Sequence, residues 1–349
     1  MNRLCLYTPE PEIRLMQITD LHLALQYGLK RVFLRRLARL VREEKPDLLV
    51  NTGDLFCKRT VAPVRQVIRL FQRTVGKLGP WTFAWGNHDL ELLRGGGHSS
   101  RFDLVEKEFR SISTCLYASA HLPRPGCTGS DAFTGGNFLI EIRKRDGEPG
   151  DKPLWHIFIL NSGKNQHLMP PVFQWMDREI RATGRTVPAI CFFHRPIRET
   201  ARAAVREIQD GYCREKASCG GENGLVHHSL KALGTIKACF YGHDHVNHFL
   251  FQKEGIAYVY GRKTLPFSYG AASLPWLARR RKRCPRDIAW GYLRVILQAA
   301  SEEEPSGEAI RIESVMEDGT VDFSWTVPHT PENREKDFSG KLFKETVCF

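Results

Sequence analysis

Residues 81–89 read Trp-Thr-Phe-Ala-Trp-Gly-Asn-His-Asp (WTFAWGNHD), a short apolar run that ends in a glycine and three polar residues. A run of this length, rich in aromatic residues and closed by a glycine, is typical of a buried strand. The sheets of α/β proteins place their ligands just beyond the carboxyl ends of the strands. Asn87 and His88 therefore stand where such a protein builds its site, and the stretch predicts an α/β fold.

Two earlier apolar runs end in the same way. Asp20 and His22 follow the run at 15–18, and Asp54 follows the run at 47–51 through a glycine. A turn made directly after a strand often needs the conformational freedom of glycine. Each signal is weak alone, because Gly-Asp pairs are common in turns, but their repetition after successive strands favours a shared site.

Apolar residues at helical spacing predict helices at 30–44 and 65–78, so the N-terminal part follows a β-α-β-α-β order. The second half continues with one helix at 171–183, and Asp318-Gly319 predicts a hairpin turn between its last two strands. The strands of this half are expected at 137–142, 155–161, 189–193, 238–241, 256–260, 292–298, 309–316 and 321–327. We expect one domain at 1–327 and a polar tail at 328–349.

The second half supplies further polar groups after strands: His194, and the sequence Gly-His-Asp-His at 242–245. Carboxylate oxygens, amide oxygens and imidazole nitrogens are ligands that manganese, iron and zinc accept. Seven such ligands suit two adjacent metal ions if one carboxylate bridges them and water completes the coordination. The candidate ligands are Asp20, His22, Asp54, Asn87, His194, His243 and His245.

The ordered motifs D-x-H, G-D, G-N-H-D, H and G-H-x-H, between Asp20 and His245, resemble those of the calcineurin-like metallophosphoesterases. The resemblance implies a two-sheet β sandwich flanked by helices. It implies that one metal ion is held by Asp20, His22 and His245, the other by Asn87, His194 and His243, with Asp54 bridging. It further implies that His88 is catalytic through contact with the substrate phosphate, and that Asp89 orients His88.

A further resemblance extends to the purple-acid-phosphatase-related group of fungi and plants. It rests on the segments 84–89, 192–196, 242–247 and 261–264. Purple acid phosphatases carry a tyrosine ligand that colours their iron, whereas this chain offers His22 in its first motif. We therefore do not expect a purple protein. The expected cofactors are two divalent or trivalent ions of manganese, iron or zinc.

These motifs imply a phosphatase that hydrolyses phosphate monoesters by attack of a hydroxide held between the two ions. The substrate could be a small molecule or a phosphoprotein. A phosphodiesterase or nuclease on the same metal core is the alternative, although the sequence shows no interleaved aromatic and basic residues of the kind that stack bases. An inactive protein-binding scaffold is a third possibility, disfavoured because every ligand is intact.

The chain has 51 Lys and Arg against 39 Asp and Glu, a net charge of +12, so its surface should attract anionic substrates. Part of the excess lies in the basic run at 279–283, which is consistent with a nuclear address, a nucleic-acid patch, the rim of a phosphosubstrate site or a solvated loop. No apolar run has the roughly 20 residues of a membrane span, and the N-terminus lacks a secretory signal. We expect a cytoplasmic protein; the sequence leaves its oligomeric state open.

Overall fold

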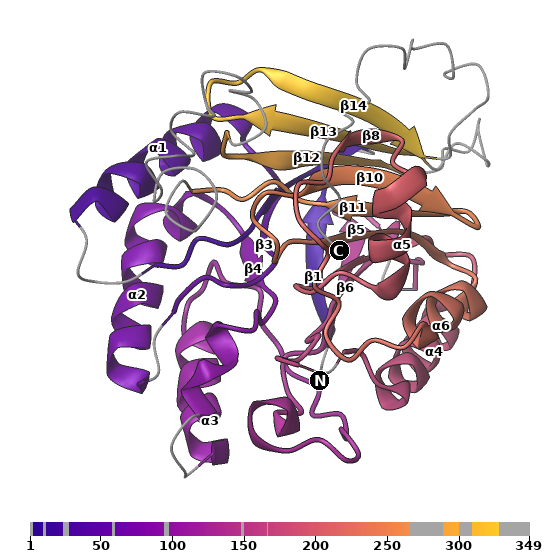
Figure 1. Cartoon of the computed structure of the whole chain (residues 1–349), viewed down its shortest axis with the longest axis horizontal. Coiled ribbons are helices and arrows are strands. Elements are labelled where there is room, and N and C mark those ends of the chain that lie inside the picture. Colours follow the sequence, from indigo (N-terminus) through magenta and orange to yellow (C-terminus); the bar gives the residue numbers. More distant parts are fainter. Residues whose placement is uncertain are drawn as a thin grey trace.

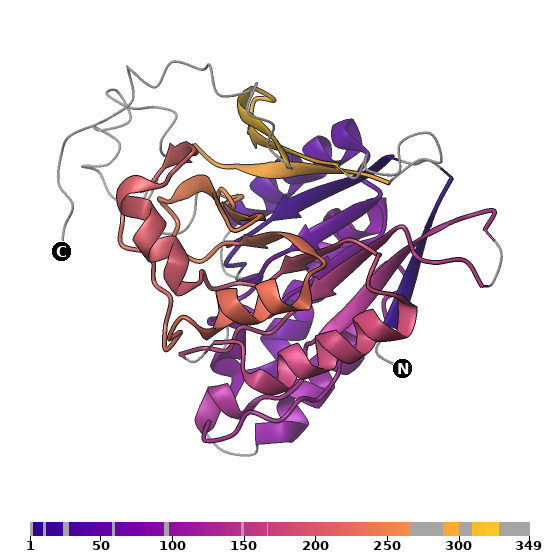
Figure 2. The same ribbon diagram turned by 90° about the vertical axis from the view of Figure 1, so that its right-hand side faces the viewer.

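The computed structural model describes residues 3–9, 12–23, 28–57, 60–93, 98–147, 150–165, 167–265, 289–299 and 309–327. The basic run at 279–283 and the tail at 328–349 lie outside these residues. In the described part, the strands form two stacked sheets, with helices on both outer sides (Figures 1 and 2). This is the two-sheet sandwich flanked by helices that the family resemblance implies.

The smaller sheet has six strands and carries the first three motifs. Its three parallel strands, β2, β3 and β4, come from the β-α-β-α-β segment. The C-terminal strands continue the sheet beyond the free edge of β2, where β12 pairs with β2 in antiparallel orientation. In spatial order the strands are β14 (Val321–Val327), β13 (Ala309–Met316), β12 (Gly291–Gln298), β2 (Glu12–Ile18), β3 (Leu48–Asn51) and β4 (Trp81–Phe83).

The larger sheet has eight strands and carries the last two motifs on β7 and β9, which are parallel neighbours. In spatial order the strands are β1 (Arg3–Thr8), β5 (Phe138–Lys144), β6 (Trp155–Ile159), β7 (Ala189–Phe192), β9 (Ile236–Tyr241), β11 (Ile256–Tyr260), β10 (His248–Lys253) and β8 (Asp210–Tyr212). Strands β1, β8 and β10 were not predicted from the sequence.

The α-helices divide into two groups, one outside each sheet (Figures 1 and 2). The group beside the smaller sheet comprises α1 (Gly28–Glu44), α2 (Val61–Thr74) and α3 (His98–Arg110), and the group beside the larger sheet comprises α4 (Pro170–Thr183), α5 (Arg198–Arg206) and α6 (Leu225–Leu233). Short 3-10 helices lie at Gly76–Leu78, Asp89–Leu93 and Gly129–Ala132. None of the described helices combines the length and apolar character needed to span a bilayer.

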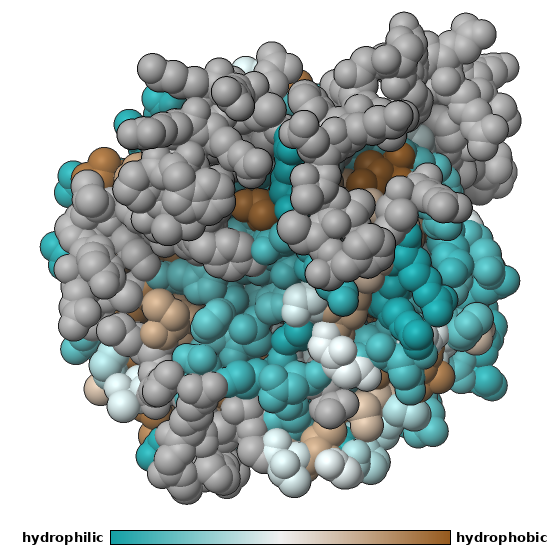
Figure 3. Space-filling model, in the orientation of Figure 1, coloured by the Kyte–Doolittle hydropathy of each residue, from teal (hydrophilic) through white to brown (hydrophobic). Residues whose placement is uncertain are grey.

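Both faces of the larger sheet are buried, which explains its nearly continuous apolar strands. Ile190 and Phe192 of β7 face the core between the sheets, whereas Cys191 of the same strand packs in a second core that also holds residues of α4 and α6. Outside these cores, the described residues on the face seen in Figure 3 are mainly hydrophilic around its middle, with separate apolar spots. The strand ends are thus fixed by two packed layers, and the motifs follow directly from them.

Candidate dinuclear metal centre

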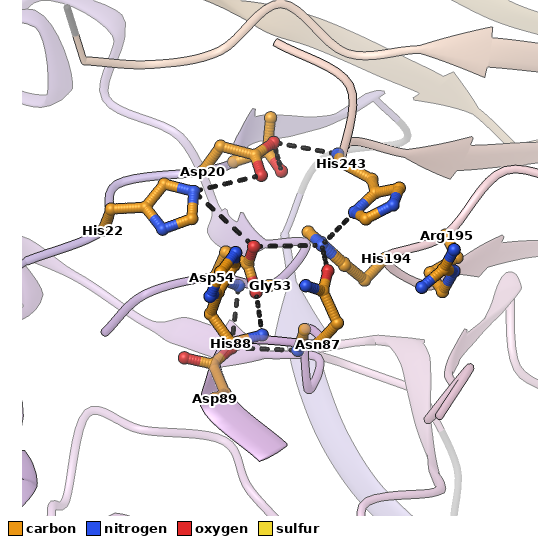
Figure 4. Close-up of polar contacts among 12 residues, drawn as sticks. Asp20, His22, Gly53, Asp54, Asn87, His88, Asp89, His194, Arg195 and His243 are labelled. Atoms are coloured by element: carbon orange, nitrogen blue, oxygen red, sulfur yellow. Dashed lines mark hydrogen bonds and ion pairs between the residues drawn. The ribbon is translucent and has the colours of Figure 1, made fainter. Parts of the chain in front are cut away.

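The candidate ligands follow the carboxyl ends of five strands, β2, β3 and β4 of one sheet and β7 and β9 of the other. The structure brings all seven together, although the sequence spreads them from Asp20 to His245. Figure 4 shows the side chains of His22 and His243 on opposite sides of Asp54. The meeting of the two sheets therefore creates one cluster from two halves of the chain.

One group of ligands surrounds Oδ1 of Asp20. This oxygen lies 3.8 Å from Nε2 of His22 and 3.3 Å from Nε2 of His245, and the two nitrogens are 3.1 Å apart. The other oxygen of Asp20 accepts hydrogen bonds from the hydroxyl of Thr19 (2.8 Å) and the backbone N–H of His243 (3.0 Å). These bonds orient the carboxylate so that Oδ1 faces the histidines.

A second group surrounds Nε2 of His194. This nitrogen lies 2.9 Å from Oδ1 of Asn87, 3.2 Å from Nδ1 of His243 and 3.3 Å from Oδ2 of Asp54. The other ring nitrogen, Nδ1, is 2.9 Å from the carbonyl oxygen of Thr52, and a hydrogen bond donated there leaves Nε2 to act as a ligand.

Asp54 lies between the two groups. Its Oδ2 is 3.5 Å from Nε2 of His22 and 3.3 Å from Nε2 of His194, while its Oδ1 accepts a hydrogen bond from the backbone N–H of His88 (2.9 Å). One carboxylate oxygen thus faces both histidine groups, which is the position that a bridging ligand requires.

The donor atoms fit metal ions in spacing and in chemistry. Ligands bound at roughly 2.0–2.2 Å from one ion lie roughly 3 Å from one another, close to the separations within each group. Among the described residues, three sets of three donor atoms lie within 4.8 Å of one another: Asp20, His22 and His245; Asp54, His194 and His243; and His22, Asp54 and His88. Backbone or hydroxyl donors occupy the outward oxygens of both aspartates, so the inward oxygens remain for cations.

The electrostatics of the cluster also favour cations. Burial alone would raise the pKa of Asp54, but the neighbouring His194, and then His22, hold that pKa below its usual range. Burial would lower the pKa of His194, yet Asp54 and Asp20 raise it to about 9. The buried carboxylates of Asp20 and Asp54 therefore stabilise a positive charge beside them. A metal ion would provide that charge in place of a proton on His194.

Four candidate ligands have a left-handed backbone conformation, which non-glycine residues rarely adopt. Their φ angles are 57° at Asp20, 43° at His22, 53° at Asp54 and 90° at His243. Such conformations cost on the order of 1 kcal/mol or more each and persist at functional sites because the surrounding structure holds them. The left-handed conformation makes the chain turn sharply after each strand, so that the side chain of the ligand points toward the centre.

Two glycines allow the close packing of these turns. Gly53 has φ of +108°, and a Cβ there would lie 2.6 Å from Nδ1 of His194. A Cβ at Gly86 would overlap Oδ1 and the backbone nitrogen of Asp54. The glycines of the motifs therefore make room for the ligands themselves.

Replacing Gly86 by alanine is expected to displace Asp54 and weaken metal binding on the order of tenfold to a hundredfold. Overpacking of this kind should also destabilise the fold by about 1–3 kcal/mol. Metal titration and urea unfolding of the variant would measure both effects. Gly150→Ala is the matched control, because a Cβ at Gly150 meets no atom of the described residues within 4 Å. Unchanged metal affinity in Gly86→Ala would contradict the tight fit around Asp54.

The surroundings of His88 differ from the expectation. The carboxylate of Asp89 does not orient the His88 ring, because it accepts hydrogen bonds from the backbone N–H groups of Asp54 (2.7 Å), Phe56 (2.9 Å) and Gly86 (2.9 Å). The acid beside the ring is Glu91, whose Oε1 lies 3.5 Å from Nδ1 of His88. Asp89 thus joins the turns after β3 and β4, and its expected orienting role is corrected.

The sequence contains one signal for the position of Glu91. It stands three residues after His88, and three residues make one turn of a 3-10 helix. The segment Asp89–Leu93 forms such a helix and brings the two side chains together.

Comparisons with known proteins agree with this geometry. The family model described as calcineurin-like phosphoesterase matches residues 13–247, so the chain belongs to that family. Two similar proteins of Arabidopsis thaliana are named probable inactive purple acid phosphatase 29, with 25% identity over 269 residues, and probable inactive purple acid phosphatase 28, with 27% identity over 283 residues. These relatives place the chain in the purple-acid-phosphatase-related group of the family.

The matches cover 70% of this chain and 66% of the first relative, and 71% of this chain and 65% of the second. The chain therefore spans just under two thirds of the length of these relatives. Among solved structures, the purple acid phosphatase PPD1 from yellow lupin seeds has a TM-score of 0.50 at 14% identity and covers 90% of this chain and 53% of that chain. This likeness concerns the fold. Membership in the family implies metal ions.

Proposed function

We propose that this chain hydrolyses phosphate monoesters at a centre of two metal ions. The observation that carries the proposal is the position of Asp54 Oδ2, within 3.5 Å of His22 and 3.3 Å of His194. Asp20, His22 and His245 would hold one ion, and Asn87, His194 and His243 the other, with Asp54 shared. The ligands suit manganese, iron or zinc.

Two ions bound here would supply a nucleophile from water at neutral pH and would neutralise charge on the phosphoryl oxygens. The residues of the chain provide the remaining parts. Asp54 and Asp20 fix the ligand geometry, and His88 stands beside the centre with its side chain 42% exposed. An imidazole in that place can donate a hydrogen bond to a phosphoryl or leaving-group oxygen as charge develops there. Asp89 holds the turn that presents His88.

The proposal also covers the boundaries of the domain and the cellular location of the protein. Strand β12 pairs with β2, whose carboxyl end leads to Asp20, so we assign residues 1–327 to the catalytic domain and 328–349 to a tail. Cytoplasmic residence remains a prediction.

Two alternatives have observations in their favour. The net charge of +12 favours a phosphodiesterase or nuclease, whose substrate would be a diester such as a nucleic acid. The words "probable inactive" in the names of two relatives favour an inactive protein-binding scaffold. The complete set of candidate ligands in this chain supports an active enzyme, because a protein-binding scaffold needs none of them.

A preference for monoesters is expected, because a monoester dianion gains more than a diester monoanion from two cations and a positive surface. With protein loaded with manganese, kcat/KM for an aryl phosphate should exceed that for the matched bis-aryl phosphate about tenfold or more. The same assay on chelator-treated protein controls for contaminating phosphatases. Higher kcat/KM on the diester or on nucleic acid would select the nuclease alternative, and activity on neither ester would select the scaffold.

A further inference from the structure

The ring of His88 lies beside the candidate ligands and has further neighbours on its other side. It packs edge-on against the ring of His22, with centroids 5.0 Å apart. On the side of Nδ1, the described part of the chain places one carboxylate within 4 Å, that of Glu91 at 3.5 Å. Asp89, the neighbouring acid in sequence, is occupied by three backbone N–H groups. Glu91 is therefore the acid that can hold the ring.

The same oxygen of Glu91 also faces a lysine from a distant segment. Nζ of Lys164 lies 3.8 Å from Oε1 of Glu91, and both side chains are only 14% exposed. By contrast, the pair of Arg39 and Glu43 on α1 has side chains 65% and 59% exposed. Ordering two long side chains away from water costs conformational entropy. The pair of Glu91 and Lys164 is therefore expected to have a role that the exposed pair of Arg39 and Glu43 lacks.

The segment that carries Lys164 is fixed from several directions. Oδ1 of Asp131 accepts hydrogen bonds from the backbone N–H groups of Lys164 (2.7 Å) and Asn165 (2.9 Å). The guanidinium of Arg195 donates to the carbonyl oxygen of Lys164, and the N–H of Gly221 donates to that of Asn165 (2.6 Å). Arg195 directly follows the candidate ligand His194. The lysine is thus tied to the same strand end that carries a ligand.

We propose that Glu91 is the positioning residue of His88 and that Lys164 positions Glu91. With Nδ1 of His88 held 3.5 Å from Glu91, the opposite ring nitrogen, Nε2, points away from Glu91 and is left for the substrate. Lys164 holds the carboxylate in place, so that the half-exposed ring does not rotate into solvent. The inference rests on the proposed function for its kinetic consequence, although the geometry of the ring can be measured without turnover.

Kinetics of a double-mutant cycle test the proposal. In otherwise unchanged protein, Glu91→Ala should lower kcat for an aryl monoester about tenfold or more, with metal content retained and KM changed less than about twofold. Glu91→Gln keeps an acceptor oxygen and should recover part of the loss. In the His88→Ala background, Glu91→Ala should change kcat less than about twofold. An equal loss in both backgrounds would overturn the proposal. Glu43→Ala, on the exposed pair of α1, is the matched control.

A second readout separates this proposal from the proposed function. The readout is the NMR spectrum of metal-loaded protein labelled with 15N-histidine. The ring signals of His88 are assigned as those that are missing from the spectrum of His88→Ala. Glu91→Gln should shift these signals, and Lys164→Met should shift them in the same direction, while Glu43→Ala leaves them unchanged. If wild-type protein shows no turnover but these shifts occur, the proposed function fails and the positioning role stands. Unshifted His88 signals in both variants would overturn the positioning role even in an active enzyme.

Discussion

The variant Asp54→Asn is expected to lose one of two bound metal ions and to turn over phosphate monoesters on the order of a thousandfold more slowly. Asp54 is the one candidate ligand whose oxygen faces both histidine groups, at 3.5 Å from His22 and 3.3 Å from His194. An asparagine has nearly the same shape but no negative charge, so it cannot offset the repulsion between two adjacent cations. The loss should therefore concern charge and metal content, with the fold preserved.

Metal analysis and kcat from the same preparation would measure both effects of Asp54→Asn. The matched control is Asp47→Asn, which lies before the opposite end of the same strand, β3, and whose Oδ2 accepts a hydrogen bond from the backbone of Arg14. It should keep two ions and near-normal turnover. Two tightly bound ions in Asp54→Asn would show that the carboxylate does not bridge them.

The variant His88→Ala is expected to keep both metal ions and to lose on the order of a hundredfold in kcat. Its backbone N–H would still donate to Asp54, because the substitution removes only the side chain. The missing imidazole can no longer donate to the phosphoryl group as charge develops in the transition state. The defect should thus fall on kcat more than on metal affinity.

Steady-state kinetics at saturating metal would measure the effect of His88→Ala. His121, which is half-exposed and contacts Glu106 and Thr134, provides a histidine control outside the centre. His121→Ala should retain activity. Near-normal kcat in His88→Ala would remove His88 from the mechanism, whereas loss of metal would make it a ligand.

Much of the fold followed from the sequence because its elements have strong periodicity. Strand β11 and the hairpin of β13 and β14 begin and end where the sequence predicts, and Gly319 in the turn has φ of 85°. Most predicted boundaries differ from the observed ones by a few residues, because side-chain patterns do not show where strand pairing stops. The seven candidate ligands were identified because each follows an apolar strand.

Other features depend on contacts that no local pattern shows. Strand β1 alternates only weakly and is a strand because it pairs with β5, and β10 begins at a polar residue, His248, whose burial comes from its neighbours in the sheet. A 3-10 helix positions Glu91, and hydrogen bonds to Asp131 and from Arg195 hold the backbone of Lys164. The role of Asp89 could not be predicted, since the backbone N–H groups that donate to its carboxylate lie in two separate turns.

The strand order of the smaller sheet also has a consequence for the time course of folding. Strand β2, which leads to Asp20, is synthesised long before β12, which pairs with its other edge. At the usual speed of translation, roughly 5–20 residues per second, the edge of β2 waits for at least several seconds. During most of this interval the nascent chain holds carboxylates without the histidines at 243 and 245. Assembly of the centre is therefore a late event, coupled to closure of the sheet.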